Sequence, residues 1–174
     1  MSYQLIDLLR NTTMQTQQRM KLPNVHYMYG PVMEIIEKLR TMSEDEHFAS
    51  VKYPMVCVVT DIDEAKGIRP GMARVNIPTI IFACLTDPKW STEERYDNSF
   101  RLVLQPLYES WLRQLARTNG IDVLDELSIP HTKTDRLYWG RTNVWTKSGQ
   151  AVDCIDAIEV TGLELWVKKQ VCNN

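Results

Sequence analysis

Few side chains in this chain of 174 residues could act as a catalytic acid or base, because it contains only three histidines. His131 precedes Asp135 by four positions, so an extended segment would place both side chains on one face. A histidine oriented by a carboxylate can serve as a general base. No serine, cysteine or threonine lies in a local nucleophile signature such as G-x-S-x-G. A structural histidine bonded to Asp135 is therefore the competing and preferred interpretation.

Paired carboxylates could instead hold a divalent cation. Asp61 and Asp63 of "DIDE" lie on one side of an extended chain, and Asp153 and Asp156 of "DCID" invite the same interpretation. The calcium-loop pattern is absent, since "AKGIRPG" follows "DIDE" with no glutamate at the closing position. We interpret both pairs as carboxylates in solvated loops. An enzyme combining His131 and Asp135 with "DIDE" would need a pocket joining residues about 70 positions apart.

No cofactor chemistry is indicated elsewhere. The four cysteines include no C-x-x-C pair, and the seven glycines form neither a P-loop nor a dinucleotide-binding motif. We therefore expect no catalytic residue, no metal and no cofactor, and we predict that the protein is not an enzyme.

Residues 136–145, "RLYWGRTNVW", concentrate aromatic rings and guanidinium groups that could stack on nucleic-acid bases. A net charge of −2 gives little electrostatic support to nucleic-acid binding. On a strand, alternation would also divide the aromatic rings between two faces. Such residues are enriched at protein interfaces, so we favour a core or subunit contact and keep a small nucleic-acid-binding protein as the alternative. The interface candidates here are Arg136, Tyr138, Trp139, Arg141 and Trp145.

The elements that position these residues follow from apolar periodicity. Helices are predicted over 31–42 and 92–118, the second beginning with a capping box at Ser91 and Glu94 and kinking or dividing at Pro106. A short helix is expected over 3–10, followed by a polar frayed end or linker. Strands are expected over the ranges 54–60, 73–86, 133–146 and 157–169.

Pro78 and the segment "DIDEAKGIRPG" give two further structural predictions. Pro78 lacks an amide donor, which places the strand 73–86 at a sheet edge or at a bulge. "DIDEAKGIRPG" is expected as a loop. The fold class is α+β, with a mixed, mostly antiparallel sheet of about four strands and two main helices packed on one face. We expect a single domain, 1–174, with 1–22 as a mobile N-terminal helix or arm.

The succession "YPMVCVVTD", "ARVNIPTIIFACLTD", "STEERYDNSFRLVLQPLYESWL", "IPHTKTDRLYWGR" and "DCIDAIEVTGLELWV" resembles small virion proteins of tailed phages and prophages of Bacteroides-type bacteria. Its layout is similar to that of tail-terminator and neck-ring proteins, the head-to-tail connectors. The resemblance implies a sixfold or twelvefold ring, made in the host cytoplasm, that joins head and tail or terminates the tail tube. It implies no catalytic residues.

Such a ring would contact portal, connector or tail-tube proteins and let genome DNA pass without sequence-specific binding. Pro78 and Arg74, on the proline-bearing strand, join the interface candidates because a cyclic ring needs two different contact surfaces. The sequence contains no apolar run of the roughly 20 residues that span a bilayer, so no membrane partner is expected.

Overall fold

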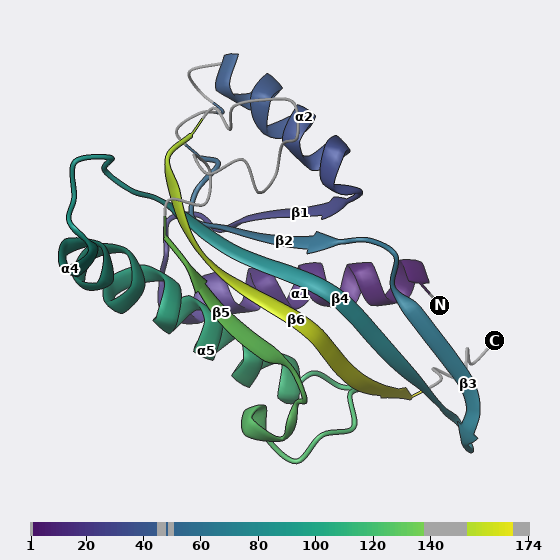
Figure 1. Ribbon diagram of the computed structural model, residues 1–174. Helices are drawn as coiled ribbons and strands as arrows, with labels where there is room; N and C mark the ends of the chain where they lie inside the picture. The colour runs from purple at the N-terminus through teal and green to yellow at the C-terminus, as the bar shows by residue number, and fades with distance from the viewer. Residues whose placement is uncertain (1, 45–47, 49–50, 138–152, 169–174) are drawn as a thin grey trace.

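The computed structural model describes residues 2–44, 48, 51–137 and 153–168, and its centre is a six-stranded sheet (Figure 1). The strands lie in the order β1-β2-β4-β6-β5, and β3 also pairs with β4. Only β1 and β2 run parallel, so the sheet is mostly antiparallel within an α+β fold, as the sequence predicts. It has more strands than expected. Their bounds are β1 His26–Gly30, β2 Met55–Val59, β3 Asp63–Arg69, β4 Met72–Leu85, β5 Thr132–Arg136 and β6 Ile155–Lys168.

Strands β4 and β6 form the spine of the sheet, because they are its longest strands and pair over nearly their whole length. Alternate residues of a strand point to opposite faces. Accordingly, Ile80 and Phe82 of β4 lie in one hydrophobic cluster and Ile81 and Ala83 lie in another. The sheet therefore has an apolar core on each face.

Helices cover both faces of this sheet (Figure 1). Helices α1 (Ser2–Met20) and α5 (Gln105–Ala116) contact each other across one face, where Trp111 is fully buried. Helix α2 (Val32–Glu44) lies on the opposite face beside β1, where it buries Ile35. The prediction that both main helices pack on a single face is therefore wrong. Helix α1, and not α2, is the neighbour of α5.

Helix α1 is longer than the sequence predicts, because its polar residues are satisfied inside the protein. The hydroxyls of Thr12, Thr13 and Thr16 are buried, and each donates to the carbonyl oxygen four residues earlier, at 2.9, 3.0 and 2.8 Å. Trp111 Nε1 also donates to Thr13 Oγ1, at 3.0 Å. Intrahelical bonds of this kind let threonine enter a core without an unpaired hydroxyl. The expected frayed end is thus the middle of a helix.

The long helix after β4 begins where predicted. Glu94 N–H donates to Ser91 Oγ at 3.2 Å, and Ser91 N–H donates to Glu94 Oε2 at 2.7 Å, which completes a capping box. The first segment, α4 (Thr92–Arg95), leads into η1 (Tyr96–Leu104), a π-helix.

The predicted division at Pro106 is confirmed. The amide of Gln105 donates to the carbonyl oxygen of Phe100, five residues earlier, and α5 starts at Gln105 with Pro106 in its first turn. Leu104 and Gln105 keep right-handed helical dihedral angles, so the chain stays helical here, and the change from the π-helical to the α-helical pattern accommodates the missing amide of Pro106. The helix therefore changes its hydrogen-bond pattern just before the residue that would interrupt it.

Two strands were not predicted. Strand β1 is only five residues long, and β3 arises from "DIDEAKGIRPG", which was expected as a loop. Strand β3 forms a hairpin with β4 through a turn at Gly71, whose φ of +71° suits glycine. Most of its side chains are exposed, which explains why its charged sequence does not resemble a buried strand.

Pro78 does not lie at a sheet edge, contrary to one form of the prediction. Strand β4 is central, with β6 on one side and β2 and β3 on the other. The β4–β6 ladder pairs Ile77 with Leu163 and Thr79 with Thr161, and Pro78 itself is skipped. The missing amide is therefore accommodated by a local interruption of the ladder.

Candidate functional site

His131 is held by partners other than Asp135. Its Nδ1 donates to the Ile129 carbonyl oxygen at 2.7 Å, so its Nε2 accepts the Tyr108 hydroxyl at 2.6 Å. Burial, reinforced by nearby carboxylates, raises the pKa of Tyr108 and keeps this hydroxyl protonated. Asp135 instead accepts from Lys133 at 2.6 Å. Both ring nitrogens thus have hydrogen-bond partners within the chain, and the predicted bond to Asp135 is wrong.

The "DIDE" carboxylates do not form a cation site. Asp61 and Asp63 are exposed, and Glu64 Oε1 lies 3.4 Å from Lys66 Nζ. Over the ranges that the structure describes, no group of three or more His, Cys, Asp or Glu side chains is placed to hold a metal ion. The cavity that Glu64 lines does not include His131, so these residues do not share a pocket.

The "DCID" carboxylates neutralise buried cations, which corrects their interpretation as solvated residues. Asp156 pairs with Arg95 at 3.1 Å, and both side chains are 0% exposed. Asp153 pairs with Lys52 at 2.5 Å, and the Lys52 side chain is 2% exposed. The partners lie 61 and 101 positions apart in the sequence, respectively. No local pattern could have indicated them, because tertiary folding alone brings them together.

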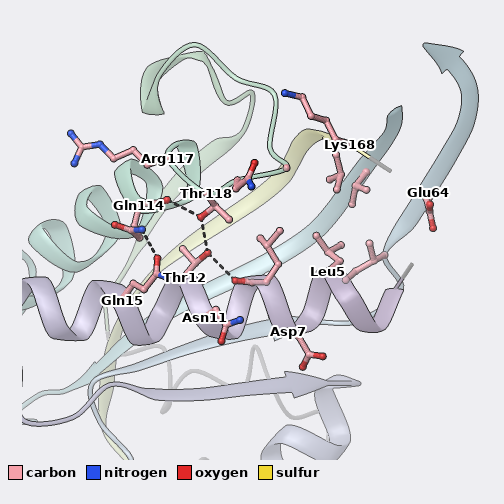
Figure 2. A pocket seen from close by; sticks show the side chains of 16 residues that line it. Leu5, Asp7, Asn11, Thr12, Gln15, Glu64, Gln114, Arg117, Thr118 and Lys168 are labelled. Atoms are coloured by element: carbon pink, nitrogen blue, oxygen red, sulfur yellow. Dashed lines mark hydrogen bonds between the residues drawn. The ribbon is translucent and has the colours of Figure 1, made fainter. Parts of the chain in front are cut away.

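A cavity of about 490 Å³ lies between α1, the end of α5 and the strands beneath them (Figure 2). Two contacts join the helices beside it: Gln114 Nε2 donates to Gln15 Oε1, and the Thr12 and Thr118 hydroxyl oxygens lie 3.4 Å apart. The lining includes no serine, cysteine or histidine. This arrangement therefore offers hydrogen-bonding groups to a bound molecule.

A larger groove, of about 820 Å³, follows β1 between α1 and α2. The Arg10 guanidinium lies 5.7 Å from the ring centroids of both Tyr27 and Tyr29, within cation–π range. Burial lowers the pKa of His26 and raises the pKa of Tyr27 well above its usual range, so both side chains are held neutral. The sequence did not indicate this groove, because an open edge is a property of strand order.

Three of the predicted interface residues are described. Arg136 ends the edge strand β5, where its Nε and Nη2 donate to Glu159 Oε2 at 2.8 and 2.6 Å. Arg74 is exposed opposite Trp166, whereas Pro78 is half-buried in the central strand. The alternation predicted for residues 136–145 begins as expected. Leu137, the residue after Arg136, packs against the core beneath α1 and α5, on the opposite face of the sheet from Arg136. Tyr138, Trp139, Arg141 and Trp145 lie outside the described residues.

The described candidates lie at opposite ends of the sheet. Arg136 pairs with Ala157 on β6, and Arg74 pairs with Trp166. At about 3.3 Å per residue these positions are roughly 30 Å apart along the strand. Arg74 and Arg136 therefore belong to separate surfaces.

Sequence reasoning also missed two exposed leucines. Leu124 and Leu127 are 95% and 91% exposed, in and beside the short 3₁₀-helix η2 (Glu126–Ser128). They have no helical or strand periodicity that would mark them as surface residues.

Comparison of the chain with protein-family models, curated proteins and solved structures gives no match. No helix among those described is long and apolar enough to span a membrane.

Proposed function

We propose that this chain is a structural subunit of a tailed phage, which assembles into a ring at the neck or the head-proximal end of the tail. The observation that carries the proposal is that the sheet ends in two unlike strands. Neither β1 nor β5 has another described strand on its outer side. A head-to-tail ring needs two different surfaces on each subunit, and open edges readily accept a strand from another chain.

The charge balance of the chain is compatible with this role. A formal net charge of −2 suits a channel that genome DNA crosses without being retained. A sixfold or twelvefold ring would contact portal, connector or tail-tube proteins within the virion. It would need no cofactor and no membrane.

The nucleic-acid-binding alternative depends on residues 136–145, "RLYWGRTNVW". Arg136 is the one arginine of residues 136–145 that lies among the described residues, where its Nε and Nη2 both donate to Glu159 Oε2. A guanidinium already paired to a carboxylate is a weaker phosphate ligand than a free one. This observation weakens the alternative.

The oligomeric state of the purified chain tests the proposal. Sedimentation velocity and negative-stain electron microscopy over a wide concentration range are expected to show closed rings of six or twelve copies. A chain that remains monomeric, even when mixed with the portal and tail-tube proteins of its own phage, contradicts the proposal. Salt-dependent binding of DNA or RNA by that monomer would favour the alternative.

A further inference from the structure

The outer edge of β1 presents backbone groups that face away from the sheet. His26 N–H donates to the Pro54 carbonyl oxygen, and the Gly30 carbonyl oxygen accepts from Thr60 N–H. Because backbone groups alternate in direction along a strand, those of Tyr27 and Tyr29 point outward. No other described strand pairs with this edge.

The groove along this edge has two walls of opposite charge. On one face of the sheet, α1 contributes Arg10, which lies over the rings of Tyr27 and Tyr29. On the other face, α2 contributes Glu34, Glu37 and Lys38, and because Lys38 Nζ lies 2.6 Å from Glu34 Oε1, Glu37 supplies the net negative charge of this wall. A strand entering the groove would therefore meet a cation on one face and carboxylates on the other.

Strand β5 lies at the opposite end of the strand order from β1, and its two faces also carry charges. Asp135 pairs with Ile158, a residue of the core beneath α1 and α5, so its side chain lies on the α1 face. Arg136 pairs with Ala157, a residue of the core beneath α2, so its guanidinium lies on the α2 face. Each of these charges has a partner within the chain, Asp135 with Lys133 and Arg136 with Glu159, so the edge offers one ion pair on each face.

We propose that β5 of one copy pairs with β1 of the next copy in the groove between α1 and α2. This inference rests on the proposed ring assembly and names its interface. Strands β1 and β5 run in opposite directions within one chain. From β1 to β5 the sheet passes through one parallel pair, β1–β2, and three antiparallel pairs, β2–β4, β4–β6 and β6–β5. A neighbour that continues the sheet with the same direction and faces therefore pairs its β1 antiparallel to β5.

Continuity of the two faces pairs opposite charges across the joint. Arg136, which stays bonded to Glu159, faces Glu37 of the next copy, and Asp135, which stays bonded to Lys133, faces its Arg10, so each of these ion pairs gains a second partner across the joint. Both strands are five residues long, so their backbone edges match in extent. Every copy uses one edge of each kind, which is the head-to-tail relation that a ring requires.

The first experiment removes one outward amide from β1. Tyr29→Pro deletes an N–H that makes no bond to β2, and proline is tolerated on an edge strand. Tyr29→Ala removes the same ring and keeps the N–H. We expect Tyr29→Pro to raise the dissociation constant between copies about tenfold or more beyond Tyr29→Ala, because an interface acceptor loses its donor. Far-ultraviolet circular dichroism and thermal unfolding verify that both variants are folded.

The second experiment reverses charges on the α2 face. Arg136→Glu and Glu37→Arg should each weaken assembly, and the double variant should recover much of the loss, because the pair is then restored with its signs exchanged. Arg101→Glu is the matched control, since Arg101 is exposed on η1, does not line the groove along β1 and, like Arg136, is paired with a carboxylate of its own chain, Asp97. Its assembly is expected to match that of the wild-type chain.

The outcomes separate this inference from the proposed function. Wild-type chain that stays monomeric under all conditions overturns both. Two other results overturn the edge pairing alone and leave the ring in place. One is that the wild-type chain forms rings but Tyr29→Pro and Tyr29→Ala have the same dissociation constant between copies. The other is that the double charge-reversal variant assembles no better than either single variant.

Discussion

At the scale of single residues, the polar groups of this chain mainly stabilise the fold. Asp153 and Asp156 resemble cation ligands in the sequence, yet each neutralises a buried basic side chain. Arg95 also donates to the Thr86 hydroxyl and to the carbonyl oxygens of Asp87 and Trp90. A buried charge needs this degree of pairing, because desolvation of an ion costs several kcal/mol.

Removal of one partner from this buried pair should therefore be costly. We expect Asp156→Ala to lower the free energy of unfolding by about 3–5 kcal/mol, since the Arg95 charge would remain buried without its carboxylate. The exposed pair Asp97–Arg101 is the control, and Asp97→Ala should cost about 0–1 kcal/mol. Urea denaturation followed by tryptophan fluorescence measures both variants. Similar losses for both would contradict the assignment of Asp156 as a structural ion-pair partner.

Two buried thiols allow a prediction about pH. Burial raises the pKa of Cys57 and of Cys84 to about 12. Both thiols should therefore stay protonated and resist maleimide at pH 8, and both should react after unfolding in urea, as counted by mass spectrometry. Because the folded-state pKa is raised, this contribution to stability is complete below the ordinary thiol pKa and decreases as the pH rises above it. Rapid labelling of folded Cys57 would contradict the burial.

At the scale of elements, the sequence predicted those with a clear apolar period. The stripe and capping box predicted the long helix, and the valine-rich run predicted β2, each to within about two residues. The rest lacked such a signal for physical reasons. Buried threonines disguise α1, β3 is charged because it is exposed, and β1 is short. Arg136 and Arg74 were correctly placed on strands, but the groove along β1 depends on which strands become neighbours.

The start of the long helix provides a prediction at this scale. Ser91→Ala should lower the free energy of unfolding by about 0.5–2 kcal/mol, because the Glu94 amide loses its acceptor. Thr92→Ala, one position later and exposed, is the control and should have a smaller effect. Thermal and urea unfolding compare the two variants. Equal losses would show that the capping bond contributes little.

The same capping box should make stability depend on pH. Hydrogen bonds from Ser91 to the Glu94 carboxylate lower the pKa of that side chain. Because the folded-state pKa is lowered, the ionised carboxylate of Glu94 stabilises the folded state. This contribution to the free energy of unfolding is complete above the ordinary glutamate pKa and is lost as the pH falls through the lowered value. Glu94→Gln should reduce this acid-dependent loss. If the free energy of unfolding of the wild-type chain and of Glu94→Gln changed equally with pH down to acidic values, this prediction would be contradicted.

At the scale of the whole molecule, α1 determines whether the chain behaves as one unit. The sequence suggested that residues 1–22 form a mobile helix or arm. In the structure, Leu9 is fully buried in the core that α1 shares with α5, and Thr13 bonds Trp111 across the two helices. A helix held by core contacts of this kind unfolds together with the sheet that it covers.

Leu9→Ala tests this cooperativity. We expect it to lower the global free energy of unfolding by about 2–5 kcal/mol, because a leucine truncated inside a packed core leaves a cavity. Met14→Ala is the matched control on the same helix, since Met14 is 50% exposed, and it should change stability by less than about 0.5 kcal/mol. Circular dichroism of the helices and fluorescence of the tryptophans should give coincident urea transitions that shift together. If α1 were a separable arm, Leu9→Ala would reduce the helical signal before the main transition and leave the tryptophan midpoint unchanged.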